Sequence, residues 1–315
     1  GSCTVAMLWP SKTFRTLRSA MLQFLSVAAI CILSCEGLPV VSRNLNPKTP
    51  SPIVFQDLNI FQLTDVHSWL SGHHHESYEE ADVGDTVSFV QHLKDQADAQ
   101  GKDLFFFDSG DIVEGTGLSD ATAVHGERIL PIVQRMPYDA ITIGNHELYH
   151  SETVLALRDS GFVAAWRGRY LTANVLDAST GKPLGATHAE VVGARAGTRL
   201  LVMGFLYDMQ GACDAVQVQP VEAAVREPWF AEAMAAAGRA DAVVVLAHMD
   251  VRDTLVSVIL SAIRAVHPAI PVVFLTGHTH YRGYAQLDPL AVSMESGKYH
   301  DTLGFLSAPL PPRPA

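Results

Sequence analysis

The chain has 315 residues, of which 48% are hydrophobic and 17% are charged, and its formal net charge is -11. This composition is typical of a folded globular protein, and the length allows one large α/β domain with a sizeable core. The acidic balance excludes a chain that coats nucleic acid, because polyanions require a basic face. We therefore expect no nucleic-acid partner, and an anionic substrate must be attracted locally.

Residues 1–37 are predicted to be a targeting segment. Lys12, Arg15 and Arg18 precede an apolar run over residues 21–33, and small residues follow it, which is the order of a secretory signal peptide. The run is short for a membrane span, so we expect no stable span unless the segment stays uncleaved as a signal anchor. A buried helix is the structural alternative. The pattern favours the secretory pathway.

A proline-rich linker is predicted over residues 38–52, a folded domain over 53–307 and a flexible tail over 308–315. Within the domain, short apolar runs alternate with longer amphipathic stretches, which indicates an α/β layer architecture. In chain order we expect a strand at 58–64, a helix at 83–99, a strand at 104–108, a helix at 127–135, strands at 140–143, 170–174 and 199–205, a helix at 221–237, a strand at 242–247, a helix at 252–266 and a strand at 272–276.

Five short segments place metal-ligand residue types just after a predicted strand. They are Asp65-Val66-His67, Asp108-Ser109-Gly110-Asp111, Gly144-Asn145-His146-Glu147, Ala247-His248-Met249-Asp250 and Gly277-His278-Thr279-His280. Ligands bind outside the carboxyl ends of strands in open α/β sheets, so these loops can converge on one site. A strand also directs alternate side chains to the same side, which would let the two outer residues of an Asp-x-His or His-x-His act on one metal.

Each segment alone has an ordinary structural explanation. Asp-x-His is commonly a turn with a surface histidine, Gly-Asp and Gly-Asn are common turn pairs, and His248 after an apolar strand fits a hydrogen-bonded core histidine. Five such segments in this order leave little room for coincidence. Carboxylate and imidazole ligands favour zinc, manganese or iron, and with Cys213 as the only cysteine after residue 37 a Cys-rich zinc site is excluded.

Together these segments resemble the signature of the calcineurin-like metallophosphoesterases. The run over residues 108–116 is similar to the Asp-x-Gly-Asp…Gly-Thr of the 5′-nucleotidase and apyrase branch, and residues 293–299 and 303–304 resemble the closing strands of that branch. Trp69, the histidine run at 73–75 and residues 147–149 are most similar to a fungal vacuolar subgroup. The resemblance covers residues 59–306, and it adds a vacuolar or lysosomal location as an alternative to secretion.

The resemblance implies an α/β fold, a four-layer α-β-β-α metallophosphatase sandwich with a dimetal site at the carboxyl ends of strands. One metal would be held by Asp65, His67 and His280, the second by Asn145, His248 and His278, and Asp111 would bridge both. A shared carboxylate lets two cations sit roughly 3.5 to 4 Å apart, close enough to clamp both oxygens of an in-line displacement.

The implied function is hydrolysis of phosphate monoesters, of nucleotide type, by in-line attack of a metal-bridging hydroxide. His146 would hydrogen-bond the phosphate and stabilise charge on the leaving oxygen, with Asn145 beside it, or it would orient a ligand. The cofactors would be two divalent ions, and the partner a small phosphorylated substrate. A phosphodiesterase or cyclic-nucleotide hydrolase on the same fold, and a non-catalytic scaffold of that fold, remain as alternatives.

Four features complicate the transfer from the family. Tyr149 stands where many 5′-nucleotidases have the aspartate that pairs with the histidine, and the second, nucleobase-binding domain of full-length relatives is missing, as it would be from a truncated chain. His73 to His75 fit either a solvated rim loop or a third metal site. Arg282, after the last motif, fits either a phosphate contact or a surface charge.

Overall fold

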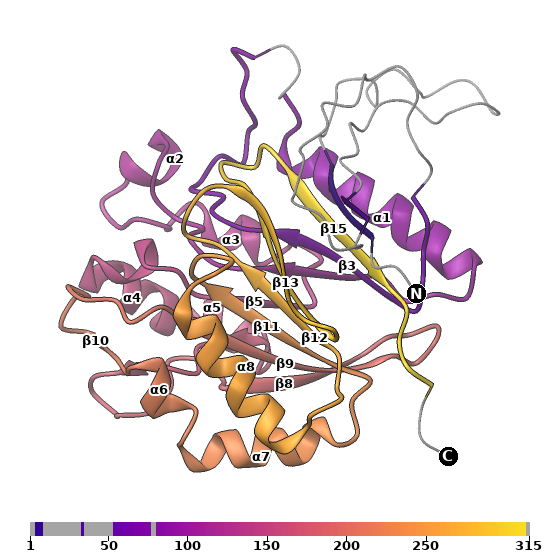
Figure 1. Ribbon diagram of the computed structural model, residues 1–315. Coiled ribbons are helices and arrows are strands. Elements are labelled where there is room, and N and C mark those ends of the chain that lie inside the picture. The colour runs from indigo at the N-terminus through magenta and orange to yellow at the C-terminus, as the bar shows by residue number, and fades with distance from the viewer. Residues whose placement is uncertain (1–3, 9–32, 35–52, 77–79, 313–315) are drawn as a thin grey trace, which may run out of the picture.

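The computed structural model describes residues 4–8, 33–34, 53–76 and 80–312. Two β-sheets pack face to face, and helices cover the outer face of each sheet, so the molecule has four layers in the order α-β-β-α (Figure 1). The expected fold class is confirmed.

The first sheet has the strand order β2-β1-β15-β3-β4-β5-β6. Strands β3 to β6 run parallel, whereas β15 lies antiparallel between β1 and β3. The strands are β1 (Thr4–Leu8), β2 (Leu33–Ser34), β3 (Leu58–Leu63), β4 (Phe105–Asp108), β5 (Ala140–Thr142), β6 (Tyr170–Leu171) and β15 (Leu303–Ala308).

The second sheet has the order β13-β14-β12-β11-β9-β8, with four parallel central strands and an antiparallel strand at each edge. A separate antiparallel pair joins β7 and β10. The strands are β7 (Val175–Asp177), β8 (His188–Val192), β9 (Arg199–Leu206), β10 (Val216–Val218), β11 (Ala242–His248), β12 (Val272–Thr276), β13 (Arg282–Asp288) and β14 (Ala291–Ser296).

The helices bury one face each against a sheet. Those of the first sheet are α1 (Val83–Ala99), α2 (Gly117–Asp120), α3 (Leu130–Val133), α4 (Ser151–Asp159) and α5 (Phe162–Ala165), and a 3₁₀ turn covers His146–Leu148. The second sheet carries α6 (Val221–Ala224), α7 (Pro228–Ala237) and α8 (Thr254–Val266). Among the described helices, none combines the length and the apolar character that crossing a membrane requires.

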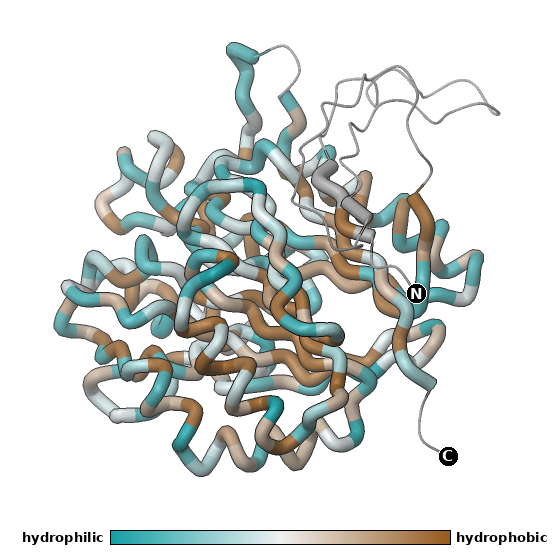
Figure 2. Tube along the Cα trace, viewed as in Figure 1, coloured by the Kyte–Doolittle hydropathy of each residue, from teal (hydrophilic) through white to brown (hydrophobic). Residues whose placement is uncertain are grey.

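Strict alternation along the buried strands builds three hydrophobic cores. In β3, Phe61 and Leu63 pack under the helices of the first sheet, whereas Leu58 and Ile60 face the other sheet. Successive side chains of a strand point to opposite faces, so a strand that is apolar throughout must be covered on both sides. The hydrophobic colour in Figure 2 accordingly follows the central strands.

Several boundaries differ from the sequence prediction for identifiable reasons. The helix expected over 221–237 is two helices, because Pro228 begins α7 and cannot continue a preceding helix. The helix expected over 127–135 is reduced to α3. Periodicity does not predict β8, β13, β14 and β15, although the resemblance places closing strands at residues 293–299 and 303–304.

Most of the predicted targeting segment and linker lies outside the described residues. The part that is described differs from the expectation, because Thr4–Leu8 pairs with β15 as a strand and Leu33–Ser34 pairs with Thr4–Val5. At the other end, β15 runs to Ala308, and the Leu310 amide donates to the Asp57 carboxylate at 3.2 Å. The predicted tail therefore begins inside the fold, and the secretory role of the N-terminal segment stays a prediction.

Candidate metal centre

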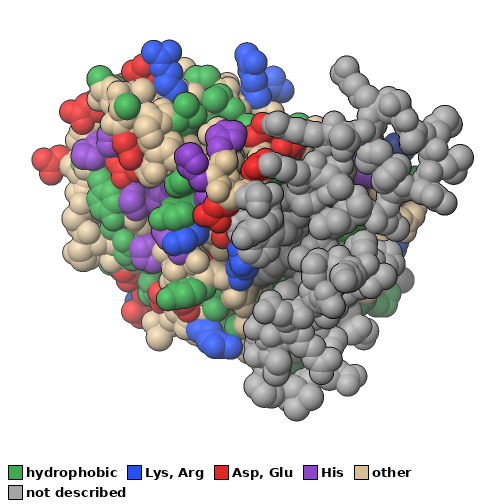
Figure 3. Space-filling view, turned by 90° about the horizontal axis from the view of Figure 1, so that it is seen from above, with side chains coloured by type: hydrophobic (Ala, Val, Ile, Leu, Met, Phe, Trp, Pro, Cys, Tyr) green, Lys and Arg blue, Asp and Glu red, His purple; other side chains and the backbone are tan. Residues whose placement is uncertain are grey.

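The five motif segments follow β3, β4, β5, β11 and β12, as predicted, and they meet at one end of the two sheets. Histidine side chains gather beside acidic ones on the face shown in Figure 3. The first sheet supplies the Asp65, Asp111 and Asn145 loops, and the second supplies His248 and the loop of His278 and His280. The site is therefore built across the junction between the sheets.

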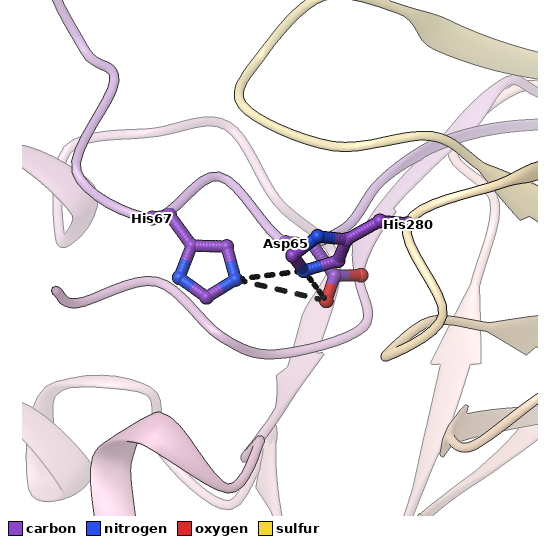
Figure 4. A group of neighbouring side chains, drawn as sticks. All are labelled: Asp65, His67 and His280. Carbon is purple, nitrogen blue, oxygen red and sulfur yellow. Dashed lines mark hydrogen bonds and ion pairs between the residues drawn. The ribbon is translucent and has the colours of Figure 1, made fainter. Parts of the chain in front are cut away.

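Asp65, His67 and His280 form the first group (Figure 4). The two imidazole Nε2 atoms lie 3.1 Å apart, and the Asp65 Oδ1 atom lies 3.4 Å from His280 Nε2 and 3.9 Å from His67 Nε2. The other carboxylate oxygen, Oδ2, accepts hydrogen bonds from the Thr64 hydroxyl at 2.6 Å and the His278 amide at 3.0 Å. The His278 amide also donates to Oδ1 at 3.1 Å, so the whole carboxylate is held by the protein while Oδ1 faces the two imidazoles.

Asp111, His248 and His278 form the second group. The Asp111 Oδ2 atom lies 3.0 Å from His248 Nε2 and 3.7 Å from His67 Nε2, so this carboxylate stands between the two groups. The His248 Nδ1 atom lies 2.8 Å from the Ser109 carbonyl. A carbonyl only accepts, so Nδ1 carries a hydrogen and Nε2 is the ring atom that faces the site.

Asn145 lies one residue before His146, whose backbone amide donates to Asp111 Oδ1 at 2.8 Å, so the Asn145 loop adjoins the second group. Its Nδ2 group donates to the Tyr149 hydroxyl at 2.9 Å, whereas its Oδ1 atom is buried and has no hydrogen-bond partner. A buried amide oxygen without a partner is costly unless something else satisfies it, and a cation does so. Tyr149 therefore orients a candidate ligand. It stands at the position where the family pattern has an aspartate.

The ligand loops adopt strained backbone conformations rather than continuing the strands. Five candidate ligands have φ in the left-handed region, where side chains with a Cβ are disfavoured, and these are Asp65 (52°), His67 (46°), Asp111 (56°), His278 (81°) and His280 (65°). The expectation that alternation along a strand would align Asp65 with His67, and His278 with His280, was wrong. Left-handed turns after the strands turn these side chains inward instead.

Two glycines allow the loops to approach each other. A Cβ at Gly144 would collide with the Asp111 carboxylate, and one at Gly277 would lie against Thr64 Oγ1 and 2.8 Å from Asp65 Oδ2. The glycine that opens each of these motifs is thus required by close packing between loops from different strands.

Negative charge is concentrated between the histidines. Burial lowers the pKa of His248, but the carboxylates of Asp111 and Asp65 and the hydrogen bond to the Ser109 carbonyl together outweigh burial and raise it to about 10. Burial conversely raises the pKa of Asp111, but His248, His67 and His146 together outweigh burial and hold this pKa well below its usual range. Burial lowers the pKa values of His67 and His278. The carboxylates that retain a proton on His248 would hold a divalent cation with the same charge.

Glu147 is a buried carboxylate whose role the sequence did not reveal. Its Oε1 atom accepts from the amides of Ile112 at 2.6 Å and Val113 at 3.0 Å, and its Oε2 atom accepts from Gly144 at 2.7 Å and Asp111 at 3.1 Å. These four hydrogen bonds fix the Asp111 loop to the Asn145 loop. The only sequence signal was an acidic residue within an otherwise ligand-rich motif.

Glu295 supports the last motif in a similar way. It accepts a hydrogen bond from the Thr279 hydroxyl at 2.7 Å and one from the Tyr281 amide at 3.3 Å. Burial raises the pKa of this carboxyl to about 7. The loop that carries His278 and His280 is therefore tied to β14.

His146 lies beside the first group, with its ring edge-on to that of His67 at a centroid distance of 4.6 Å. Its backbone amide donates to Asp111 Oδ1 at 2.8 Å, and its Nδ1 donates to Glu114 Oε2 at 2.6 Å. The side chain keeps 32% of its surface exposed. His146 is thus attached to the ligand set and remains open to solvent, as a substrate contact requires.

The other candidate residues lie away from the ligand set. His73 stacks on Trp69 at 4.3 Å and contacts the Tyr299 carbonyl through Nε2 at 2.8 Å, whereas His74 and His75 are exposed. None of these three belongs to a group of metal-ligand side chains among the described residues. Arg282 donates to the Asp301 carboxylate at 2.9 Å and to the Thr302 hydroxyl at 2.5 Å, so its proposed phosphate contact stays a prediction.

The donor set fits divalent metals, since four imidazoles, two carboxylates and one amide oxygen are the ligand types of zinc, manganese and iron in hydrolases. The charge between the histidines and the unpartnered oxygen of Asn145 both favour a cation here.

Comparison with known proteins agrees with this geometry. Residues 58–282 match the family model of the calcineurin-like phosphoesterases. A Schizosaccharomyces pombe protein of uncharacterized function is 37% identical over 81% of this chain, and a secreted protein of Arthroderma benhamiae is 31% identical over 92%. The chain spans 43% and 47% of these two relatives, so about half of their length.

Among solved structures, the 5′-nucleotidase of Candida albicans matches with a TM-score of 0.79 and 30% identity, over 83% of this chain and 49% of that protein. The likeness agrees with the 5′-nucleotidase branch of the family. The family uses divalent metals for phosphoester hydrolysis, and the convergent groups found here are candidates to hold them. The chain belongs to the calcineurin-like phosphoesterase family.

Proposed function

We propose that this chain hydrolyses phosphate monoesters of the nucleotide type with the help of two divalent cations. The observation that carries the proposal is the position of Asp111, whose Oδ2 atom lies within 4 Å of imidazoles from both ligand groups. A carboxylate shared in this way holds two cations close together, which suits the in-line displacement at phosphorus.

Each residue has a distinct part in the proposal. Asp65, His67 and His280 would hold one cation, Asn145, His248 and His278 would hold the other, and Asp111 would serve both. When bound, the cations lower the pKa of water and neutralise charge on the phosphoryl group. His146 donates a hydrogen bond from Nε2 to a phosphoryl or leaving oxygen, since its Nδ1 is taken by Glu114. Glu147 keeps the Asp111 and Asn145 loops together while the substrate enters.

The nucleotide class of the substrate rests on the Candida albicans 5′-nucleotidase, which this chain resembles over about half of that protein. The relatives are longer, so recognition of the nucleoside in a whole protein of this kind is a separate matter from the phosphate chemistry. The basal reaction needs only the described loops, and the chain is proposed to act on simple monoesters as well.

The proposed location is the secretory pathway. The order of basic, apolar and small residues over residues 1–37 supports it, as does the name of the secreted Arthroderma benhamiae relative. We expect a fungal host to secrete the chain. Mass spectrometry of the secreted protein should show that the N-terminal segment has been removed.

Turnover of three substrates tests the function. The purified chain, with manganese, zinc or a chelator, is given p-nitrophenyl phosphate, bis-p-nitrophenyl phosphate and AMP. We expect metal-dependent release of phosphate from the monoester and AMP, and little from the diester. The variant Asp111→Asn should lose this turnover, whereas Asp95→Asn, which changes an exposed carboxylate on α1, should keep it.

A diester preference would replace the monoesterase with a phosphodiesterase on the same residues. Absence of turnover in a folded sample that retains two metals per chain would contradict hydrolysis and favour a non-catalytic role for the fold.

A further inference from the structure

We propose that Glu114 is the positioning residue of His146, and that it does for this histidine what a carboxylate at position 149 would do in the family pattern. The inference rests on the proposed function, because the role of His146 in phosphate hydrolysis does. The chemical consequence is that the stabilisation of the leaving oxygen depends on a side chain from the Asp111 loop.

The contact between the two side chains is short and directional. The His146 Nδ1 atom lies 2.6 Å from Glu114 Oε2. A carboxylate accepts, so Nδ1 carries a hydrogen and the ring is held in one orientation. Donation to the substrate from Nε2 then uses the imidazolium form, which carries a hydrogen on both nitrogens. The Tyr149 hydroxyl accepts from Asn145 Nδ2, whereas the hydrogen bond of the His146 ring goes to Glu114. Tyr149 therefore orients Asn145, and Glu114 orients His146.

The backbone conformation that directs Glu114 toward His146 is energetically unfavourable. Its φ is 63°, in the left-handed region that a glutamate seldom adopts, and the next residue, Gly115, has φ of 112°. The Glu114 amide donates to the Ser119 hydroxyl at 3.0 Å, which holds the turn. An energetically disfavoured conformation of this kind persists where its surroundings enforce it, and here it directs a carboxylate to the histidine beside the ligands.

Two further histidines hold the other oxygen of Glu114. His125 Nδ1 lies 2.8 Å from Oε1, and His150 Nε2 lies 3.5 Å from the same atom. The Glu114 side chain is only 15% exposed, whereas His150 is 54% exposed. We call Glu114, His125, His146 and His150 the outer cluster. Because Oε1 is occupied by His125, Oε2 cannot easily rotate away from His146.

A hydrogen-bonded imidazole stabilises a poor leaving group more than a good one, because more negative charge develops on the oxygen of the poorer one. Removing the orienting carboxylate should therefore slow phenyl phosphate more than p-nitrophenyl phosphate, two esters of nearly the same shape. A carboxylate that merely maintained the fold would slow both equally.

The test compares Glu114→Gln, Glu114→Asp, His146→Ala and the double variant Glu114→Gln/His146→Ala, with Glu152→Gln on the exposed face of α4 as the matched control. For Glu114→Gln we expect kcat on phenyl phosphate to fall about 10- to 100-fold, with a smaller fall on p-nitrophenyl phosphate and little change in KM or metal content. Glu114→Asp should recover part of the loss. In the His146→Ala background the same change should add less than about twofold, because the two residues act as one unit.

Three results would overturn the inference: equal losses on the two esters, full additivity in the double variant, or loss of bound metal from Glu114→Gln. The last result would assign Glu114 and its two histidines to a metal rather than to His146.

If the wild-type chain turns over neither ester, the proposed function fails, and the contact is then tested without turnover. The ¹⁵N resonances of the His146 ring, assigned with His146→Ala, should report a protonated Nδ1 that shifts in Glu114→Gln and not in Glu152→Gln. An unchanged ring spectrum in Glu114→Gln would refute the positioning role.

Discussion

The inner ligand set and the outer cluster are built in different ways, although His146 of the outer cluster lies beside the inner set. The inner ligand set consists of the candidate metal ligands Asp65, His67, Asp111, Asn145, His248, His278 and His280. Inner ligands such as Asp111 and His248 are at most 1% exposed, and their remaining polar atoms are held largely by backbone groups. In the outer cluster, the partners are side chains, and exposure reaches 54% at His150. Fixed backbone groups cannot relax when a ligand changes, whereas exposed side chains and water can.

The difference indicates in which of the two regions the protein should tolerate substitutions. Charge and strain are concentrated on the inner set, so a single substitution there removes an interaction that nothing replaces. The outer cluster has three histidines around one carboxylate, and losing a peripheral histidine leaves the others in place. We expect a graded series of effects, from the bridging carboxylate outward.

The largest effect is expected for Asp111→Asn. Replacing the carboxylate between the two groups removes charge that both cations need, so kcat/KM should fall about 10³-fold or more, which corresponds to roughly 4 kcal/mol of transition-state stabilisation. Elemental analysis should show loss of bound metal from this variant and not from Asp95→Asn. Retention of both metals and of activity would show that Asp111 does not bridge.

Glu147→Ala tests the support beneath the inner set. Four buried backbone amides lose their acceptor. Leaving buried donors unpaired costs about 1–3 kcal/mol each, so the free energy of unfolding should fall by at least about 3 kcal/mol in urea titrations. The exposed Glu152→Ala should change it by less than about 0.5 kcal/mol. A loss below about 1 kcal/mol would mean that the two loops hold together without Glu147.

His300 sharpens the comparison, because it is as buried as His248 yet has the opposite pKa shift. Burial lowers the pKa of His300 to about 4, and its Nε2 lies 2.7 Å from the Thr86 hydroxyl. The unfolded chain binds a proton near pH 6.5, but the folded chain does so only near pH 4. Stability is therefore present above pH 6.5 and should be lost by about 3 kcal/mol as the pH falls to about 4.

The substitution His300→Asn should flatten this part of the pH dependence while lowering stability at pH 7. Unfolding titrations with a chelator present isolate the effect from metal release. An unchanged slope between pH 6.5 and 4 would assign the acid sensitivity to other groups.

Tyr149→Phe tests the boundary between the two regions. Without the hydroxyl, the Asn145 amide loses the acceptor that fixes its orientation, so metal affinity should fall about tenfold, or about 1.4 kcal/mol. Competition with a chromophoric chelator measures this change, and Tyr281→Phe, at a side chain 73% exposed, is the control. Equal affinities for both variants would show that the amide is held by other contacts.

The smallest effect is expected for His150→Ala. Its contact with Glu114 is long, and the side chain is more than half exposed, so kcat/KM should change by less than about threefold. A loss above tenfold would mean that the outer cluster is as intolerant as the inner set, and the distinction between them would have to be abandoned.

Much of the architecture followed from the sequence, because buried parallel strands are apolar throughout. Runs such as Val243-Val244-Val245 are readable, and the motifs after them identify the edge where ligands converge. Edge strands such as β8 and β13, which are partly exposed and polar, lack that signal. Their pairing is set by neighbours far along the chain rather than by local pattern.

The candidate ligands were also readable, because five segments with metal-ligand residue types each follow a predicted strand. The manner in which they meet was not, because a left-handed φ at Asp65 or His280 leaves no mark on residue identity. Glu114 and Glu147 were overlooked as functional residues for a related reason. Their importance depends on which amides and imidazoles the fold brings to them, and no spacing rule predicts contacts between separate loops.

The position of β15 has a consequence for the order of synthesis. This strand lies inside the sheet, between β1 and β3, whereas the parallel strands of the sheet all precede residue 172 in the chain. Residues 303–308 are therefore synthesised long after those parallel strands. A ribosome must deliver nearly the entire domain before that gap closes, and until then the edge of β3 offers unpaired amides and carbonyls. We therefore expect late, non-local folding, with the nascent chain dependent on chaperones during the interval.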